Sequence, residues 1–261
     1  MADQPPGRRE LLRERGGSPV IAIQKHLHDL ESDDFLVRSE SIAELEKLGQ
    51  PAAEAIVDSL LKGPSRLDRL TSYSDALEEI GRPSVNVIIH ALRDIDDVRR
   101  PEHAALIENL VETLARIGGR GVVRHVTDQL GKLDRAIRRN HNRILVDCCE
   151  AAKVRIHRQL GELGAKQALE DLLAMLGDGR RRVRSGIVEA VEQLGDRRAL
   201  VPLLRLHRLE ESVSFSGALT IKGAFREIAR REKIGGPDHP VFKELTPEER
   251  ATLEKLLPKK H

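Results

Sequence analysis

Residues 178–209, DGRRRVRSGIVEAVEQLGDRRALVPLLRLHRL, decide the fold because they contain one helix, a turn and a second helix. The pair Leu194-Gly195 marks the end of the first helix, and the apolar residues from Leu200 onward belong to the second. Glycine readily adopts the left-handed conformation that ends a helix. The stretch therefore predicts a helical hairpin with a tight turn.

The same pattern recurs along the chain. An apolar residue followed by glycine returns every 31 to 46 residues, at Leu48-Gly49, Ile80-Gly81, Ile117-Gly118, Leu163-Gly164 and Leu194-Gly195. Ahead of each glycine the apolar residues step by three and four, as in Leu145, Cys149, Ala152 and Ile156, which predicts a helix with one buried stripe. Pro51 and Pro83 lie where second helices would begin, the position that proline tolerates best. Repetition at this period predicts a stack of helical hairpins.

Residues 178–209 resemble HEAT repeats, especially the bacterial kind found in phycobilisome lyases. The resemblance is carried by Asp178, Val183-Arg184, Ala190, Leu194-Gly195-Asp196 and residues 198–204. Residues 33–63 are similar, with Asp33, Val37-Arg38, Leu48-Gly49 and Ala53 at matching places. The resemblance extends over roughly residues 18–235 and implies an all-α fold, a right-handed α-solenoid of about five to six HEAT-like helical hairpins with capping helices. It also implies that Arg38 and Arg184 pair with an aspartate of a neighbouring turn, here Asp33 or Asp34 and Asp178.

Three segments are expected. Residues 1–17 are expected to be a disordered tail, residues 18–235 the solenoid, and residues 236–261 a C-terminal segment with a capping helix. The first cap is a short helix with the apolar stripe Val20, Ile23, Leu27 and Leu30. Thr246-Pro247-Glu248-Glu249 has the residue types that begin a helix, and Leu253, Leu256 and Leu257 continue it.

The sequence contains no pattern typical of an active site or a cofactor site. His141, Cys148, Cys149 and His157 are the only His/Cys cluster, but on a helix His141 and His157 each lie more than two turns from Cys149, so no metal site is expected. No phosphate-binding loop or nucleophile elbow is present. We therefore expect a protein that is not an enzyme and has no cofactor. No apolar stretch is long enough for membrane insertion, and the adjacent Cys148 and Cys149 suit a reducing compartment, so the expected location is cytoplasmic.

Charge is distributed unevenly along the chain. Residues 20–97 carry 8 Lys and Arg against 16 Asp and Glu, whereas residues 98–235 carry 27 against 18. Two basic clusters lie at or beside expected loops: Lys132, Arg135, Arg138, Arg139 and Arg143, and then Arg180, Arg181, Arg182, Arg197 and Arg198. Equivalent loops of a solenoid line up along one edge, so the clusters predict a partner-binding stripe.

The stripe suits a protein partner with an acidic surface, and a phosphate backbone is the alternative. An interaction scaffold is the favoured function. Nucleic-acid binding and a lyase-type subunit that handles a prosthetic group remain open, and the sequence leaves the oligomeric state undecided.

Overall fold

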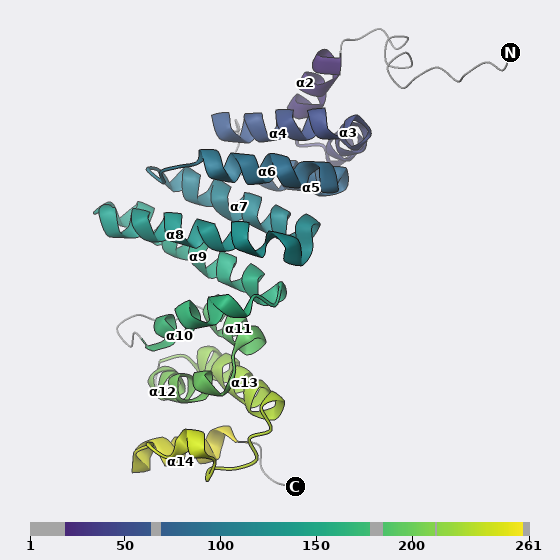
Figure 1. The fold of residues 1–261 in the computed structure, drawn as a ribbon. Helices are drawn as coiled ribbons and strands as arrows, with labels where there is room; N and C mark the ends of the chain where they lie inside the picture. Colours follow the sequence, from purple (N-terminus) through teal and green to yellow (C-terminus); the bar gives the residue numbers. More distant parts are fainter. Residues whose placement is uncertain (1–18, 64–68, 178–184, 212, 258–261) are drawn as a thin grey trace, which may run out of the picture. The chain divides into compact units, whose positions relative to one another are not determined.

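The regular structure of the described residues is entirely helical, as predicted (Figure 1). The computed structural model describes residues 19–63, 69–177, 185–211 and 213–257. Within these ranges there is no strand. The α-helices are α2 (Pro19–Asp29), α3 (Phe35–Leu48), α4 (Gln50–Lys62), α5 (Leu70–Ile80), α6 (Arg82–Asp94), α7 (Pro101–Gly118), α8 (Val123–Arg139), α9 (Arg143–Glu162), α10 (Leu169–Gly177), α11 (Ser185–Leu194), α12 (Leu200–Glu211), α13 (Phe215–Arg231) and α14 (Pro247–Leu256). Short 3-10 turns are η2 (Gly119–Val122), η3 (Lys166–Ala168), η4 (Arg197–Ala199) and η5 (Pro240–Phe242).

The helices form two compact units, residues 1–97 with 105–118 and residues 98–104 with 119–261. In the first unit α3 packs on α5 and α4 packs on α6, so equivalent helices of successive hairpins lie against each other. Two polar contacts join α5 to α7. The Ser74 hydroxyl of α5 donates to Asn109 of α7, and the Arg116 guanidinium of α7 pairs with Glu78 of α5. In the second unit α9, α11 and α13 pack in series, and α12 packs against α10, α13 and α14. Each unit is therefore a stack of hairpins.

The apolar-glycine pairs mark the turns, but the glycines serve different purposes. Gly49, Gly81 and Gly164 have positive φ angles of 65°, 74° and 68°, as a helix-ending glycine requires. At the third turn α7 continues through Gly118, and the residue with a positive φ is Gly119. Gly195 is not in the left-handed region. A Cβ at Gly195 would collide with the Val191 carbonyl oxygen and lie 2.8 Å from Ile228 Cδ1, so glycine is needed there for close packing.

Helices α9 and α11 run parallel and in register. A Cβ on Gly186 would lie 2.6 Å from Val154, and a Cβ on Gly161 would lie 3.4 Å from the Ala190 Cα. Arg158 of α9 lies 3.8 Å from Glu189 of α11. Later residues of α9 therefore contact later residues of α11, as parallel helices require. This register determines where the loops of the second unit lie.

Arg38 and Asp33 do not form the ion pair that the HEAT resemblance implied. The Arg38 guanidinium donates to the backbone carbonyls of Ser32 and Asp33, at 2.8 and 3.0 Å. The Asp33 carboxylate instead accepts from Arg69, at the start of the next hairpin, and the Asp34 carboxylate caps α3 by accepting from the Leu36 amide. Successive hairpins are thus joined by an arginine-aspartate contact, but the arginine is Arg69 and not Arg38. Arg184 and Asp178 lie outside the described residues.

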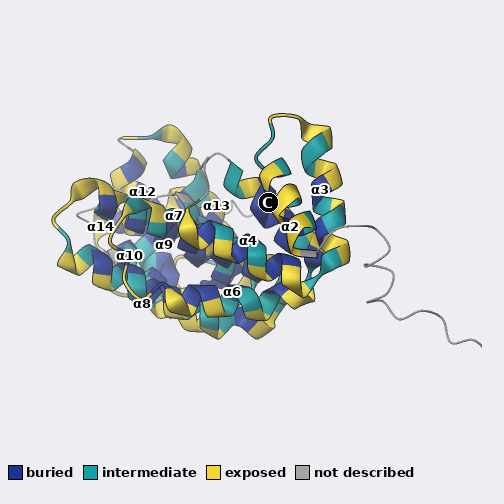
Figure 2. Cartoon of the chain, turned by 90° about the horizontal axis from the view of Figure 1, so that it is seen from above, coloured by how far each residue is buried: buried dark blue, intermediate teal, exposed yellow. Residues whose placement is uncertain are grey.

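The core is mainly aliphatic, and each helix buries one face (Figure 2). In α2 the residues Ile23, Leu27 and Leu30 are buried as expected, but Val20 is 64% exposed, so the expectation for Val20 was wrong. The expected C-terminal helix is α14, where Thr246 and Glu249 form a capping box. Helix α14 packs on α12, and Arg205 of α12 pairs with Glu249 at 2.8 Å. The expected tail, residues 1–17, lies outside the described residues.

Candidate functional site

Helix α8 has one buried face and one basic face. Its buried residues include Val126, Leu130, Leu133 and Ala136, which follow helical spacing. Its exposed residues include Arg124, Arg135, Arg138 and Arg139, and Asp128 is the exposed carboxylate among them. Packing of the apolar stripe against α9 therefore directs a predominantly positive face towards solvent.

The arginines in the second half of α8 lack carboxylate partners. Arg135, Arg138 and Arg139 are exposed and form no ion pair with any described residue. Arg143, the first residue of α9, has a 94% exposed side chain and only a 3.9 Å contact with Asp147. Lys132 is half-buried. Most of the predicted residues of the first cluster are thus available to a partner.

The guanidinium groups of Arg135, Arg138 and Arg139 project from neighbouring turns of one helix. Arg135 and Arg139 lie one helical turn apart, a rise of about 6 Å. Arg143 follows after the short α8–α9 loop. Charges separated by less than the Debye length of about 8 Å are only partly screened, so their potentials add. We call Arg135, Arg138, Arg139, Arg143 and the adjacent Ile144 the α8–α9 basic surface.

Ile144 is a feature that the sequence interpretation missed. Its side chain is 68% exposed, although it is a large aliphatic residue. It lies one position ahead of Leu145, which begins the buried stripe of α9, so it points away from the core. An apolar residue off the buried stripe and directly after Arg143 was the signal in the sequence.

The second predicted cluster does not join the first. Arg197 and Arg198 lie in η4, just after α11, whose C-terminal residues pack beside Gly161 near the end of α9. Arg143 begins α9, about 27 Å from Gly161 at a rise of 1.5 Å per residue. This distance is several Debye lengths, so the expected stripe does not run from Arg143 to Arg197 and Arg198.

Arg198 also has carboxylate partners, one in its own loop and one in α10. Its guanidinium lies 2.9 Å from the Asp196 carboxylate and also contacts Glu170. These hydrogen bonds raise the pKa of Arg198 and lower the pKa of Asp196. Arg197 is exposed. Arg180, Arg181 and Arg182 lie outside the described residues.

The histidines and cysteines of the sequence cluster do not converge. His157 is fully buried with Nε2 2.7 Å from Asp171 Oδ2, and Cys149 is buried eight residues earlier in α9, a rise of about 12 Å. Burial raises the pKa of Cys149 to about 11, so its thiol stays protonated near neutral pH. His141 is exposed. Among the described residues no group of three or more His, Cys, Asp or Glu side chains could hold a metal ion.

Comparison with known proteins supports the helical-repeat fold in one region of the chain. The family model for HEAT repeats matches residues 141–213, which include the stretch 178–209. The match is to HEAT repeats as a class and supports the HEAT-repeat family without singling out the lyase type. No curated protein and no solved structure matches the chain significantly. In the described part of the chain no helix has the length and apolar character needed to cross a membrane.

Proposed function

We propose that this chain is a non-enzymatic HEAT-repeat scaffold that binds a partner protein with an acidic surface through the α8–α9 basic surface. The observation that carries the proposal is the set of exposed arginines without carboxylate partners among the described residues, Arg135, Arg138 and Arg139, together with the exposed Ile144 at the start of the next helix. HEAT repeats generally serve as protein-interaction scaffolds, which supports the class of function. The adjacent Cys148 and Cys149, both free thiols, suit a reducing, cytoplasmic setting.

Among these arginines, Arg135 is the one whose position a role at the helix end does not explain. Cations in the last turn of a helix offset the partial negative charge of its C-terminus, a contribution of about 0.3–1 kcal/mol each. That role suffices for Arg138 and Arg139. Arg135 lies before the last turn and contacts no carboxylate among the described residues, so the helix end does not explain it. An external anionic group does.

Ile144 favours a protein partner over nucleic acid. Protein interfaces combine a few apolar anchors with a polar rim, and burying an exposed isoleucine side chain contributes about 1.5–3 kcal/mol. A phosphate backbone would use the arginines and leave Ile144 in water. Residues 123–162, which form α8, α9 and their loop, contain no Phe, Tyr or Trp, so no base-stacking platform is built into this hairpin.

Affinity purification from cells that express the protein naturally tests the proposal. Three forms are compared, each with and without nuclease: the wild type, the triple variant Arg135→Glu, Arg138→Glu and Arg139→Glu, and a matched variant with Arg82→Glu, Arg120→Glu and Arg197→Glu. The matched variant reverses the same number of exposed arginines, none of which belongs to the α8–α9 basic surface.

We expect a protein that is retained by the wild type and the matched variant, survives nuclease and is lost with the first triple variant. Loss of all specific capture on nuclease treatment would favour nucleic-acid binding instead. Equal capture by both triple variants would contradict the proposed surface.

A further inference from the structure

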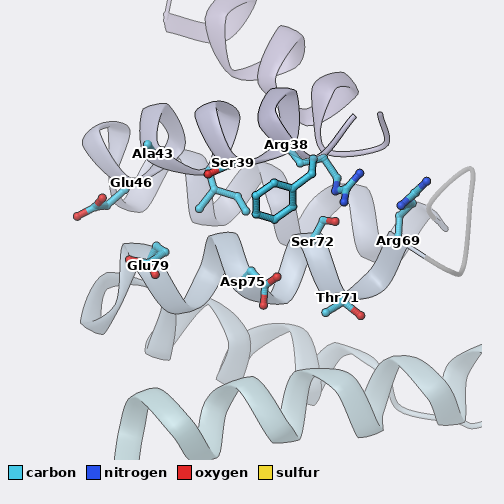
Figure 3. A pocket seen from close by; sticks show the side chains of 11 residues that line it. Arg38, Ser39, Ala43, Glu46, Arg69, Thr71, Ser72, Asp75 and Glu79 are labelled. Carbon is cyan, nitrogen blue, oxygen red and sulfur yellow. The ribbon is translucent and has the colours of Figure 1, made fainter. Parts of the chain in front are cut away.

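The first unit contains a groove between α3 and α5 that the function above does not use (Figure 3). Its volume is about 500 Å³. The lining side chains come from both helices and are Phe35, Arg38, Ser39, Ile42, Ala43, Glu46, Arg69, Thr71, Ser72, Asp75 and Glu79. Residues 39 and 46 of α3 lie opposite residues 72 and 79 of α5, since the two helices pack side by side.

An exposed aromatic ring lies at one end of this groove. Phe35 is 69% exposed, whereas Tyr73, Phe225 and Phe242 are fully buried. The Arg38 guanidinium lies 5.8 Å from the centre of the Phe35 ring, which holds the ring over the groove by a cation-π contact. A large apolar group that folding leaves in water is available to a ligand.

The same end of the groove is cationic. Arg38 is held by hydrogen bonds to two backbone carbonyls and forms no ion pair with a carboxylate of a described residue. Arg69 lies beside it and contacts the Asp33 carboxylate. Figure 3 shows both guanidinium groups at this end. A guanidinium held in place in this way can bind a carboxylate at low entropic cost.

The other end is anionic. Glu46 and Glu79 project from α3 and α5, and Asp75 lies between them and the arginines (Figure 3). Partial burial raises the pKa of Asp75, an effect that nearby Arg116 opposes. None of the three forms an ion pair at hydrogen-bonding distance with a described residue. Like charges on facing helices repel, and a cation from a ligand would relieve that repulsion.

We propose that this groove binds an extended peptide segment of another protein, with an acidic residue at the Arg38 end, a basic residue at the Glu46–Glu79 end and an apolar side chain against Phe35. Arg38 and Glu46 are eight residues apart on α3, a rise of about 12 Å. An extended peptide spans that distance in about four residues at 3.3 Å each. The expected peptide motif therefore contains an acidic and a basic residue four positions apart, in either order.

The groove suits an extended segment better than a helix. A helix already satisfies its own backbone amides and carbonyls, so it would not use hydroxyl groups in the groove for that purpose. An extended segment keeps unsatisfied backbone amides and carbonyls. The hydroxyls of Ser39, Thr71 and Ser72 line the groove and can pair with them. This inference rests on the proposal that the chain is a scaffold, but it does not depend on the α8–α9 basic surface.

Fluorescence polarisation with short synthetic peptides tests the inference on the full chain. The labelled probe is an uncharged heptapeptide with one central leucine, into which one Glu and one Lys are placed at separations of two to six positions in both orders. We expect the tightest binding at a separation of four. Phe35→Ser should weaken that binding, and Glu46→Lys with Glu79→Lys should weaken it by about tenfold or more.

A charge swap separates recognition from folding. Glu46 and Glu79 are exposed, so their replacement should leave the melting temperature nearly unchanged. Replacing the probe's Lys by Glu should then restore binding to the Glu46→Lys, Glu79→Lys variant. Binding that is independent of spacing, absence of binding to any probe, or failure of the rescue would overturn the groove proposal.

The reversal of Arg135, Arg138 and Arg139 is the control for the other surface. It should leave peptide binding in the groove unchanged, so the two proposals can fail separately.

Discussion

The buried imidazole of His157 lies between two acceptors: its Nε2 is 2.7 Å from Oδ2 of Asp171, and its Nδ1 is 2.8 Å from the Lys153 carbonyl oxygen. A carbonyl and an ionised carboxylate only accept hydrogen bonds, so both ring nitrogens are satisfied only when both carry a proton. Lys153 in turn donates to Asp134 of α8 at 2.5 Å. This network joins α8, α9 and α10 through polar groups that are partly out of water.

Removing the carboxylate of Asp171 should destabilise the second unit. Asp171→Ala leaves a fully buried imidazole without its partner, and a lost charge-assisted bond of this kind costs about 1–3 kcal/mol. Glu170→Ala is the matched control because Glu170 lies in the same first turn of α10, but its side chain is 73% exposed. The control should change stability by less than about 0.5 kcal/mol. Urea unfolding followed by circular dichroism measures both, and equal effects would show that the His157 contact contributes nothing.

The same contact predicts a dependence of stability on pH. The hydrogen bond from His157 lowers the pKa of Asp171 in the folded chain. A carboxylate with a depressed folded pKa stabilises the fold above its unfolded pKa of about 3.9, and this contribution is lost as pH falls through the folded value. Thermal melts from neutral pH down to pH 3 should therefore show a smaller decline for Asp171→Ala than for the wild type. Parallel curves would contradict the assignment.

Two glycines in the second unit should respond in opposite directions to the same substitution. Gly195→Ala would place a Cβ against the Val191 carbonyl and Ile228, and overpacking of this kind costs about 1–3 kcal/mol. Gly223→Ala, in the middle of α13, would place its Cβ in open space, and replacing glycine within a helix stabilises by about 0.5–1 kcal/mol. Thermal denaturation of the two single variants checks both signs. A stabilising Gly195→Ala would refute the close packing of α11 on α13.

The helical hairpins could be predicted from the sequence because their signals are local. Leu48-Gly49 and Ile80-Gly81 end helices where glycine permits a positive φ, and Pro51 and Pro83 follow within the first turn of the next helix. The reason for Gly195 could not be read from the sequence. That glycine is required by Ile228, which lies one repeat further along the chain.

The candidate surfaces were predicted less well, since they depend on register between helices. The α8 arginines are neighbours along one helix, so their clustering could be predicted. Arg197 and Arg143 were expected along one edge, but the parallel packing of α9 and α11 places them at opposite ends of α9. The α3–α5 groove needs Glu46 and Glu79 from different hairpins, and the exposure of Phe35 follows from tertiary packing. Neither the groove nor the exposure of Phe35 is indicated by residues that are close together in the sequence.

The central claim is that the α8–α9 basic surface binds an acidic partner, and the salt dependence of affinity tests it most directly. The measurement is Kd for the partner recovered by affinity purification, determined by isothermal titration calorimetry over a series of NaCl concentrations. Reversing Arg135, Arg138 and Arg139 should raise Kd by about tenfold or more and flatten its dependence on salt, while the Arg82, Arg120 and Arg197 reversal leaves both close to the wild-type values. Wild-type affinity and an unchanged salt slope in the first variant would contradict the account.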